Sequence, residues 1–383
     1  MKEKYITGKS IFTDKPLKVG ITGGTVTSVE AGDDCRNILA PGFMDIQING
    51  YNSKDYSSDL NSAQIKELVL DIAQSGTTRH FPTIITNSES SILCSIRNII
   101  EARKSSSLVE RAIPGIHIEG PFISPSEGAR GVHDPKHIRP ADFDEFLRWQ
   151  EAAEGIIRIV TVSPENEETL SFIRQITETG VIAAIGHTDA TADMIERAVD
   201  AGARLSTHLG NGSPAFIPRL ENFIWKQLSS DKLISSIIAD GFHIPPYVLN
   251  CFSRCKGRDN TILISDAAAL AGNKPGLYKW GDMDVEIFED GHMGLHNTTN
   301  LAGAAYLLNR CISYLTRHTK MSLQDSIRCA TLNPRKLTGG SCWDTDPVVG
   351  EKADIVSFRM VEGTMKINRT IDFDTDLYNS NEE

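Results

Sequence analysis

The sequence predicts an α/β protein, a (β/α)8 TIM-like barrel with a small β-sandwich domain formed by the N- and C-terminal strands. Eight apolar, strand-like runs follow one another between residues 43 and 266. Segments with helical spacing of apolar residues separate most of these runs. Parallel strands joined by helical crossovers close most readily into a barrel. A doubly wound open sheet is the alternative at this point.

The two ends of the chain read differently from its middle. From Lys4 to about Glu30 the residues alternate as in short polar strands, and VGITGGTVTSVE predicts a hairpin that turns at Gly23 and Gly24. Near the other end, VVGEKADIVSF and GTMKINRTI also read as strands. We therefore predict that 1–40 and 345–383 form the small β domain and that 41–344 form the barrel.

The barrel elements follow in order. The eight runs are GFMDIQI, TRHFPTII, GIHIEG, IIRIVTV, VIAAIGH, RLSTHL, ISSIIAD and TILISD. The helical pattern is clear in SAQIKELVLDIAQSG, where Ile65, Leu68 and Ile72 share a face and Gly76 can end the helix. Beyond the eighth run we predict an antiparallel ribbon in LYKWGDMDVEIFEDGHMGLH, and then helices in LAGAAYLLNRCISYLTRH and SLQDSIRCATLNPRKLTG.

Composition excludes several classes of partner. The 383 residues carry a formal net charge of -11, which gives no broad basic surface for nucleic acid. No segment reaches the roughly 18 apolar residues of a membrane helix, and the polar start MKEKYITGKS does not resemble a signal peptide. The seven cysteines are scattered without CxxC spacing, as expected of reduced thiols. We expect a cytoplasmic protein with a small-molecule substrate.

Ionisable side chains stand at one end of the predicted strands. Glu119, His187, His208 and Asp266 stand at the ends of the third, fifth, sixth and eighth runs, and His243 follows the seventh. The carboxyl ends of barrel strands open onto one mouth, where such enzymes place their chemistry. These residues should therefore converge.

Glu119, His187 and His208 predict a metal site. Two imidazoles and a carboxylate suit a borderline divalent cation and leave one position open for water. Each histidine alone could equally be a hydrogen-bonded structural residue, and the glutamate could cap a helix or pair with an arginine. Asp266 could act as a general base that takes a proton from water and then as a general acid that returns it. A fourth metal ligand or a helix cap would also account for an aspartate at this position.

Longer motifs carry a resemblance to a known family. They are APGFMDIQINGY, HIEGPF with GVHDP, IGHTDATADMIERAVDAGARLSTHL, IIADGFHI, LISDAAALAG, TTNLAGAAYLLNR and SIRCATLNPRKLTG. Over nearly its full length the chain resembles the N-acetylglucosamine-6-phosphate deacetylases of the amidohydrolase superfamily, as a divergent member. The resemblance implies that Glu119, His187 and His208 bind the metal, that Asp266 is the general acid and base, and that His133 helps to polarise the scissile carbonyl.

The resemblance also implies a substrate site. Asn211, Gly212, His243 and Leu301 match positions that line the sugar-phosphate site. Arg219 matches an arginine that reaches the phosphate from a neighbouring subunit, and this match implies a homodimer. Without the resemblance, Arg219 is simply a surface cation.

The first strand bears on the number of metal ions. Gln47 and Asn49 stand where most of the superfamily has two histidines that build another metal site, and amides are weak zinc ligands. They are therefore read as vestigial second-metal positions, and the same amides could also hydrogen-bond within the barrel. We expect one divalent ion, zinc first, with Fe²⁺, Co²⁺ or Ni²⁺ as alternatives.

Three segments depart from the family pattern. The segment after His208 reads Gly210 to Pro214 without the usual aromatic, alanine and methionine. The loop at 122–132 is about two residues longer and brings Arg130 close to the site, and Ala268 and Leu270 replace a usual threonine and proline. These loops contact substrate, so the reaction class is better determined than the sugar.

The expected reaction is hydrolysis of the acetamide of N-acetylglucosamine 6-phosphate to glucosamine 6-phosphate and acetate. A deacetylase of a related N-acyl amino sugar or N-acyl amino acid is the alternative. A catalytically inactive scaffold of this fold is the third reading. All three predicted metal ligands and Asp266 are present in the sequence, which argues against an inactive scaffold.

Overall fold

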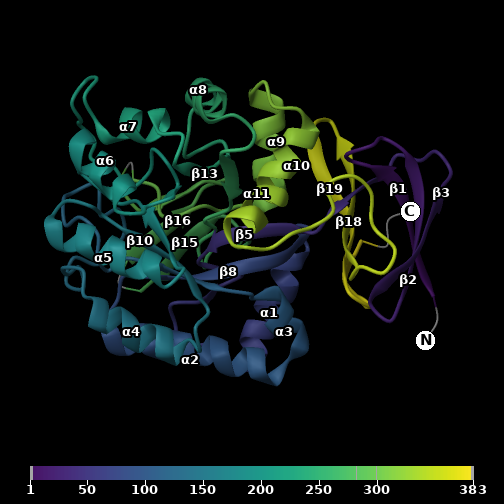
Figure 1. Cartoon of the computed structure of the whole chain (residues 1–383), viewed down its shortest axis with the longest axis horizontal. Helices are drawn as coiled ribbons and strands as arrows, with labels where there is room; N and C mark the ends of the chain where they lie inside the picture. Colours follow the sequence, from purple (N-terminus) through teal and green to yellow (C-terminus); the bar gives the residue numbers. More distant parts are fainter. Residues whose placement is uncertain (1–2, 282, 299, 381–383) are drawn as a thin grey trace.

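The computed structural model describes residues 3–281, 283–298 and 300–380 and contains an eight-stranded parallel barrel beside a smaller sheet (Figure 1). The barrel strands lie in chain order around the ring. They are β5 (Phe43–Ile48), β8 (Thr77–Ile85), β9 (Ile116–Glu119), β10 (Ile157–Val162), β11 (Ile182–Ile185), β12 (Leu205–Ser206), β13 (Ile234–Ile238) and β14 (Thr261–Ile264). All eight predicted runs are confirmed as these strands.

The ring closes where the first and last barrel strands meet. Just beyond β14, the backbone N–H of Asp266 donates to the carbonyl of Gln47 at 2.9 Å, and that of Asn49 donates to the carbonyl of Ala267 at 2.9 Å. These bonds join the carboxyl end of β5 to that of β14. The doubly wound open sheet is therefore excluded, and the barrel prediction is confirmed.

Helices cover the barrel and bury their apolar faces against it. In α1, Asn61 forms a capping box at the start, Ile65 and Leu68 are buried, and Gly76 follows the end with φ +86°. The helices are α1 (Ser62–Ala73), α2 (Glu89–Ser105), α3 (Ser107–Ala112), α4 (Phe143–Ala152), α5 (Glu167–Glu178), α6 (Ala192–Asp200), α7 (Phe223–Ser229), α8 (Pro246–Lys256), α9 (Leu308–His318), α10 (Leu323–Ala330) and α11 (Leu332–Leu337).

The strands from both chain ends share one seven-stranded sheet in the order β20-β19-β18-β4-β1-β2-β3. They are β1 (Lys4–Ser10), β2 (Pro16–Thr22), β3 (Thr25–Ala31), β4 (Ile38–Pro41), β18 (Asp354–Val361), β19 (Thr364–Asp372) and β20 (Thr375–Asn379). Val19 and Leu39 from the first half pack with Ile355 and Ile371 from the second in one core. The predicted hairpin at Gly23 is confirmed, while the exact domain limits stay a prediction.

Two elements expected in the last third of the chain are present but begin later than predicted. Helix α9 begins at Leu308, because Leu301 and Ala304 instead form β-bridges to Gly294 and Ala267 beside the barrel mouth. Strand β18 begins only at Asp354, and the preceding VVGEK is not a strand. The predicted ribbon is confirmed as β15 (Gly276–Trp280), β16 (Met283–Ile287) and β17 (Met293–Leu295), and a short hairpin, β6 (Gly50–Tyr51) with β7 (Lys54–Asp55), was not predicted.

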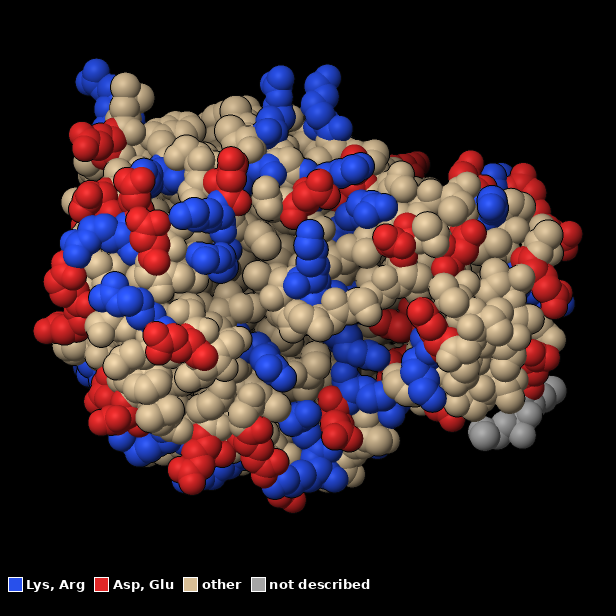
Figure 2. Space-filling model, viewed as in Figure 1, with Lys and Arg blue, Asp and Glu red and all other residues tan. Residues whose placement is uncertain are grey.

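The surface is mixed in charge. On the face drawn in Figure 2, acidic and basic side chains are interspersed over the barrel. Within the described ranges, no helix has the length and apolar character needed to cross a membrane.

A buried ion pair fastens the small sheet to the barrel. The carboxylate of Asp354 accepts from Arg335 at 2.7 Å and from the Thr78 hydroxyl at 2.6 Å. Burial raises the pKa of Asp354, but the positive charges of Arg335 and Arg79 and these hydrogen bonds outweigh it, so that the pKa lies below its ordinary value. The pair therefore stabilises the fold above the unfolded-state pKa and ceases to do so as the pH falls through the lowered one.

We expect Asp354→Asn to lower the free energy of unfolding by about 3 kcal/mol at pH 7, because the buried Arg335 loses its counter-charge. Urea denaturation at pH 7 and below pH 4 measures this, and the difference from wild type should shrink at low pH. Asp376→Asn removes more exposed pairs with Arg369 and Lys4 and should cost only about 1 kcal/mol. Equal losses of unfolding free energy in the two variants would show that the buried pair of Asp354 and Arg335 contributes no more than an exposed one.

Candidate active site

The three predicted ligands meet at the barrel mouth. Glu119 ends β9, and His187 and His208 each stand two residues after β11 and β12. Oε1 of Glu119 lies 3.2 Å from Nε2 of His187 and 2.9 Å from Nε2 of His208, and the two Nε2 atoms are 3.0 Å apart. All three side chains are buried. The parallel strands thus bring together residues from distant parts of the chain.

This donor set fits a divalent cation. Atoms bound about 2.1 Å from a tetrahedral zinc ion lie roughly 3.4 Å from one another, close to the spacing of these three donors. Nδ1 of His187 is 2.8 Å from the carbonyl oxygen of Ala129, an acceptor that holds the proton on Nδ1 and leaves the Nε2 lone pair facing the other donors. The residues present therefore fit one ion.

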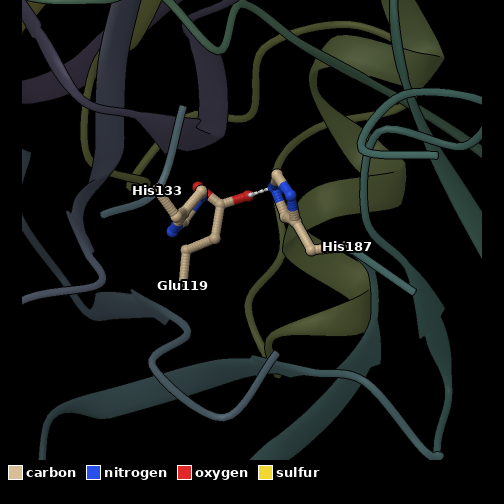
Figure 3. A group of neighbouring side chains, drawn as sticks. All are labelled: Glu119, His133 and His187. Carbon is tan, nitrogen blue, oxygen red and sulfur yellow. Dashed lines mark hydrogen bonds and ion pairs between the residues drawn. The ribbon is translucent and has the colours of Figure 1, made fainter. Parts of the chain in front are cut away.

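His133 lies beside this set. Glu119, His133 and His187 each offer a donor atom within 4.8 Å of the others, and Figure 3 shows their side chains grouped together. The rings of His133 and His187 meet edge to face, with centroids 4.3 Å apart. Nε2 of His208 likewise lies within 3.0 Å of donor atoms on both Glu119 and His187, so His133 and His208 both stand beside this pair.

The surroundings of His133 favour a neutral imidazole. Its Nδ1 lies 2.7 Å from the hydroxyl of Thr86. Burial, and then the neighbouring His187, lower the pKa of His133 to about 3. With the Thr86 hydroxyl donating to Nδ1, the proton stays on Nε2, so that this nitrogen can donate a hydrogen bond to a carbonyl oxygen.

Asp266 is held by two amide side chains at the carboxyl end of β5. Asn49 Nδ2 donates to Oδ1 of Asp266 at 2.8 Å, and Gln47 Nε2 lies 3.3 Å from the same oxygen and 2.8 Å from Oε1 of Glu119. Burial, together with the charge of Glu119, raises the pKa of Asp266 to about 6. Both amides bond to Oδ1, which leaves Oδ2 to exchange a proton.

Strained backbone marks the same positions. His187, His208 and Asp266 have φ angles of 49°, 30° and 48°, in the left-handed region that residues with a Cβ rarely adopt. Such conformations persist where the surrounding structure fixes them, and they gather at functional sites. The chain turns sharply after each strand and directs these side chains into the mouth.

A cavity of about 470 Å³ opens over these residues, and its wall includes four of the predicted substrate contacts, Asn211, Gly212, His243 and Leu301. Gly212 has φ +55°, and a Cβ there would stand 2.7 Å from Nδ1 of His187, so that only glycine fits. His243 is oriented by Asp240, whose Oδ2 lies 2.8 Å from its Nδ1.

Arg219 is the exception among the predicted site residues. It is exposed and is not among the described residues that line the cavity of its own chain.

Sequence reasoning missed three residues that hold the others, namely Thr86, Ala129 and Asp240. The three-residue spacing of Asp240 and His243 in IADGFHI was a usable signal. The other two contacts join residues 47 and 58 positions apart and leave no local pattern.

Comparison with known proteins agrees with this geometry. Residues 38–376 match the model of the amidohydrolase family. The N-acetylglucosamine-6-phosphate deacetylase of Bacillus subtilis (strain 168) is 31% identical over 351 residues, which cover 88% of this chain and 87% of that protein. The chain belongs to this deacetylase family. The resemblance inferred from the motifs is thereby confirmed, and the family's members are hydrolases that act on amide bonds.

Other members of the deacetylase family extend the comparison. The human N-acetylglucosamine-6-phosphate deacetylase is 31% identical over 80% of this chain and 76% of its own, and an N-acetylgalactosamine-6-phosphate deacetylase from Shewanella sp. (strain ANA-3) is 27% identical over 77% and 73%. A D267A mutant of the Mycobacterium smegmatis enzyme, solved with N-acetyl-D-glucosamine-6-phosphate, superposes with a TM-score of 0.87 at 24% identity and covers 99% of this chain and 100% of that one. This last likeness establishes the fold.

Proposed function

We propose that this chain hydrolyses the acetamide of N-acetylglucosamine 6-phosphate to glucosamine 6-phosphate and acetate. The observation that carries the proposal is the convergence of Glu119, His187 and His208 beside Asp266 in the cavity. The names of the relatives support the choice of sugar.

The proposed metal content is one divalent ion per chain, zinc first among Fe²⁺, Co²⁺ and Ni²⁺. Gln47 and Asn49 support a single ion, because the amide of Gln47 bridges Glu119 and Asp266 and that of Asn49 donates to Asp266, where a second cation would act. A cation held by the three donors polarises the acetyl carbonyl and activates water when it is bound. Metal analysis of the purified protein gives its identity and number.

The chain's own residues then move the protons. Oδ2 of Asp266 takes a proton from the attacking water, whose oxygen bonds to the carbonyl carbon. Nε2–H of His133 donates to the carbonyl oxygen as negative charge develops there. When the C–N bond breaks, Asp266 delivers that proton to the departing nitrogen, which restores its carboxylate, and the amine leaves with acetic acid, which gives up the second proton of the water to solvent as acetate.

A related substrate is the second candidate. The cavity wall at 210–214 departs from the common pattern, and a relative named N-acetylgalactosamine-6-phosphate deacetylase is 27% identical. Acetate release from the two 6-phosphates and from unphosphorylated N-acetylglucosamine decides between the readings. Turnover of the glucosamine derivative supports the proposal, and a clear preference for the galactosamine epimer would replace the substrate while keeping the chemistry.

A homodimer is part of the proposal. Arg219 is flanked by large exposed apolar side chains, Phe216, Leu220 and Trp225, which are 95%, 75% and 49% exposed. Exposed apolar side chains so close in sequence to Arg219 support a protein interface, and a partner seated there would receive Arg219 in its own cavity. A cytoplasmic location is also proposed, and the seven free thiols suit it.

We expect Arg219→Ala to raise the Michaelis constant for the phosphorylated sugar at least tenfold, because a charge-assisted contact to phosphate is lost. Steady-state kinetics on both sugars measure this. Equal effects on phosphorylated and unphosphorylated substrate would remove Arg219 from phosphate recognition. Lys226→Ala is the matched control. Lys226 lies on α7 and pairs with Glu196, and its removal should leave the Michaelis constants for both sugars unchanged.

A further inference from the structure

The charge of the cavity poses a problem for an anionic substrate. Its described lining contains the carboxyl groups of Glu119, Glu127 and Asp266. Among the described lining residues, Arg130 is the only lysine or arginine. A phosphate that enters this cavity therefore meets one permanent cation from the chain itself, and its recognition needs such a charge.

Arg130 has the geometry of a residue that is free to bind. Its backbone is fixed, because its N–H donates to the carbonyl of Ser126 at 3.0 Å and its carbonyl accepts from the N–H of His133 at 3.1 Å. The side chain is half-buried, and its guanidinium forms no hydrogen bond or ion pair with the described residues. A guanidinium left without a protein partner in a cavity is available to a ligand.

The loop that carries Arg130 lies against the predicted sugar-phosphate wall. A Cβ added to Gly128 would stand 2.9 Å from the carbonyl oxygen of Ser213, so the two segments touch through their backbones. The neighbouring Ala129 accepts from His187. The two segments that depart from the family pattern thus form one wall, which holds both Arg130 and Asn211.

We propose that Arg130 binds the phosphate of the substrate from within the same chain and thereby sets the preference for phosphorylated over unphosphorylated amino sugars. This inference rests on the proposed function. The planar guanidinium can form two parallel N–H···O bonds to a phosphate, whereas a lysine in its place supplies only a point charge. Arg219 lies outside the cavity of its own chain, so the two arginines can be tested separately.

The test compares kcat/KM for N-acetylglucosamine 6-phosphate with that for N-acetylglucosamine in wild type, Arg130→Ala and Arg130→Lys. We expect Arg130→Ala to lower the ratio of the two values by about 10- to 100-fold, and Arg130→Lys to restore part of it. Lys136→Ala is the control. Lys136 lines only the adjoining cavity, so its removal takes away the same charge nearby and should leave the ratio unchanged.

Calorimetric binding of glucosamine 6-phosphate and of glucosamine provides a second readout that needs no turnover. Loss of the affinity difference in Arg130→Ala supports the inference. An unchanged preference in both assays, in a variant with a wild-type circular dichroism spectrum, overturns it. Absence of wild-type turnover of the phosphorylated sugar, with glucosamine 6-phosphate still bound through Arg130, would instead count against the proposed function.

Discussion

Asp266→Asn should lower kcat for acetate release by about 10²- to 10⁴-fold, because the amide cannot carry the proton from water to the leaving nitrogen. The substitution keeps the shape of the side chain, so the Michaelis constant should change little. Acetate release under saturating substrate, with metal content measured on the same sample, checks this. Asp134→Asn, on the neighbouring loop, is the matched control and should leave kcat within about twofold of wild type.

Two outcomes for Asp266→Asn separate its possible roles. Loss of activity together with loss of metal would make Asp266 a ligand, the alternative that its position after β14 leaves open. Full activity with metal bound would show that another group moves the proton. Only inactivity with the metal retained supports proton transfer.

Replacement of a metal donor should have an effect of similar size by another route. We expect His208→Ala to lose the bound metal and to lower kcat/KM by at least about 10³-fold, since two remaining donors cannot hold a cation tightly. Metal analysis after dialysis, with kinetics before and after, measures both effects. His137→Ala, which removes a histidine lining only the adjoining cavity, should change neither.

Comparison of His133→Ala with His208→Ala decides which of these two histidines binds the metal. If His133→Ala loses the metal while His208→Ala keeps it, the overlapping donor set of Glu119, His133 and His187 is the true site. Chelation of wild type should also lower its melting temperature, because an ion that binds only the folded chain stabilises it.

Much of the fold follows from the sequence because its barrel strands are short, apolar and bounded. Fully buried parallel strands such as β9 and β14 leave short runs rich in isoleucine, and an ionisable residue at the end of such a run or two residues beyond it stands at the mouth. That local rule finds Glu119, His187, His208 and Asp266. It fails where pairing is non-local, as at Leu301, where an apolar segment with helical spacing forms bridges instead of a helix.

The site was harder to predict than the fold for the same reason. The bonds from His187 to Ala129 and from His133 to Thr86 depend on how loops from different strands pack together. The accessible volume around Arg130 is likewise a property of packed loops. The number of residues between two positions carries no information about such contacts.

The contact between β5 and β14 determines when the barrel can close during synthesis of the chain. Asn49 and Asp266, which meet there, stand 217 positions apart in the chain, and the first 266 of the 383 residues must be synthesised before they can touch. No shorter nascent chain contains Glu119, His187, His208 and Asp266 together. The complete site therefore forms only once the eighth barrel strand has been made and the ring can close.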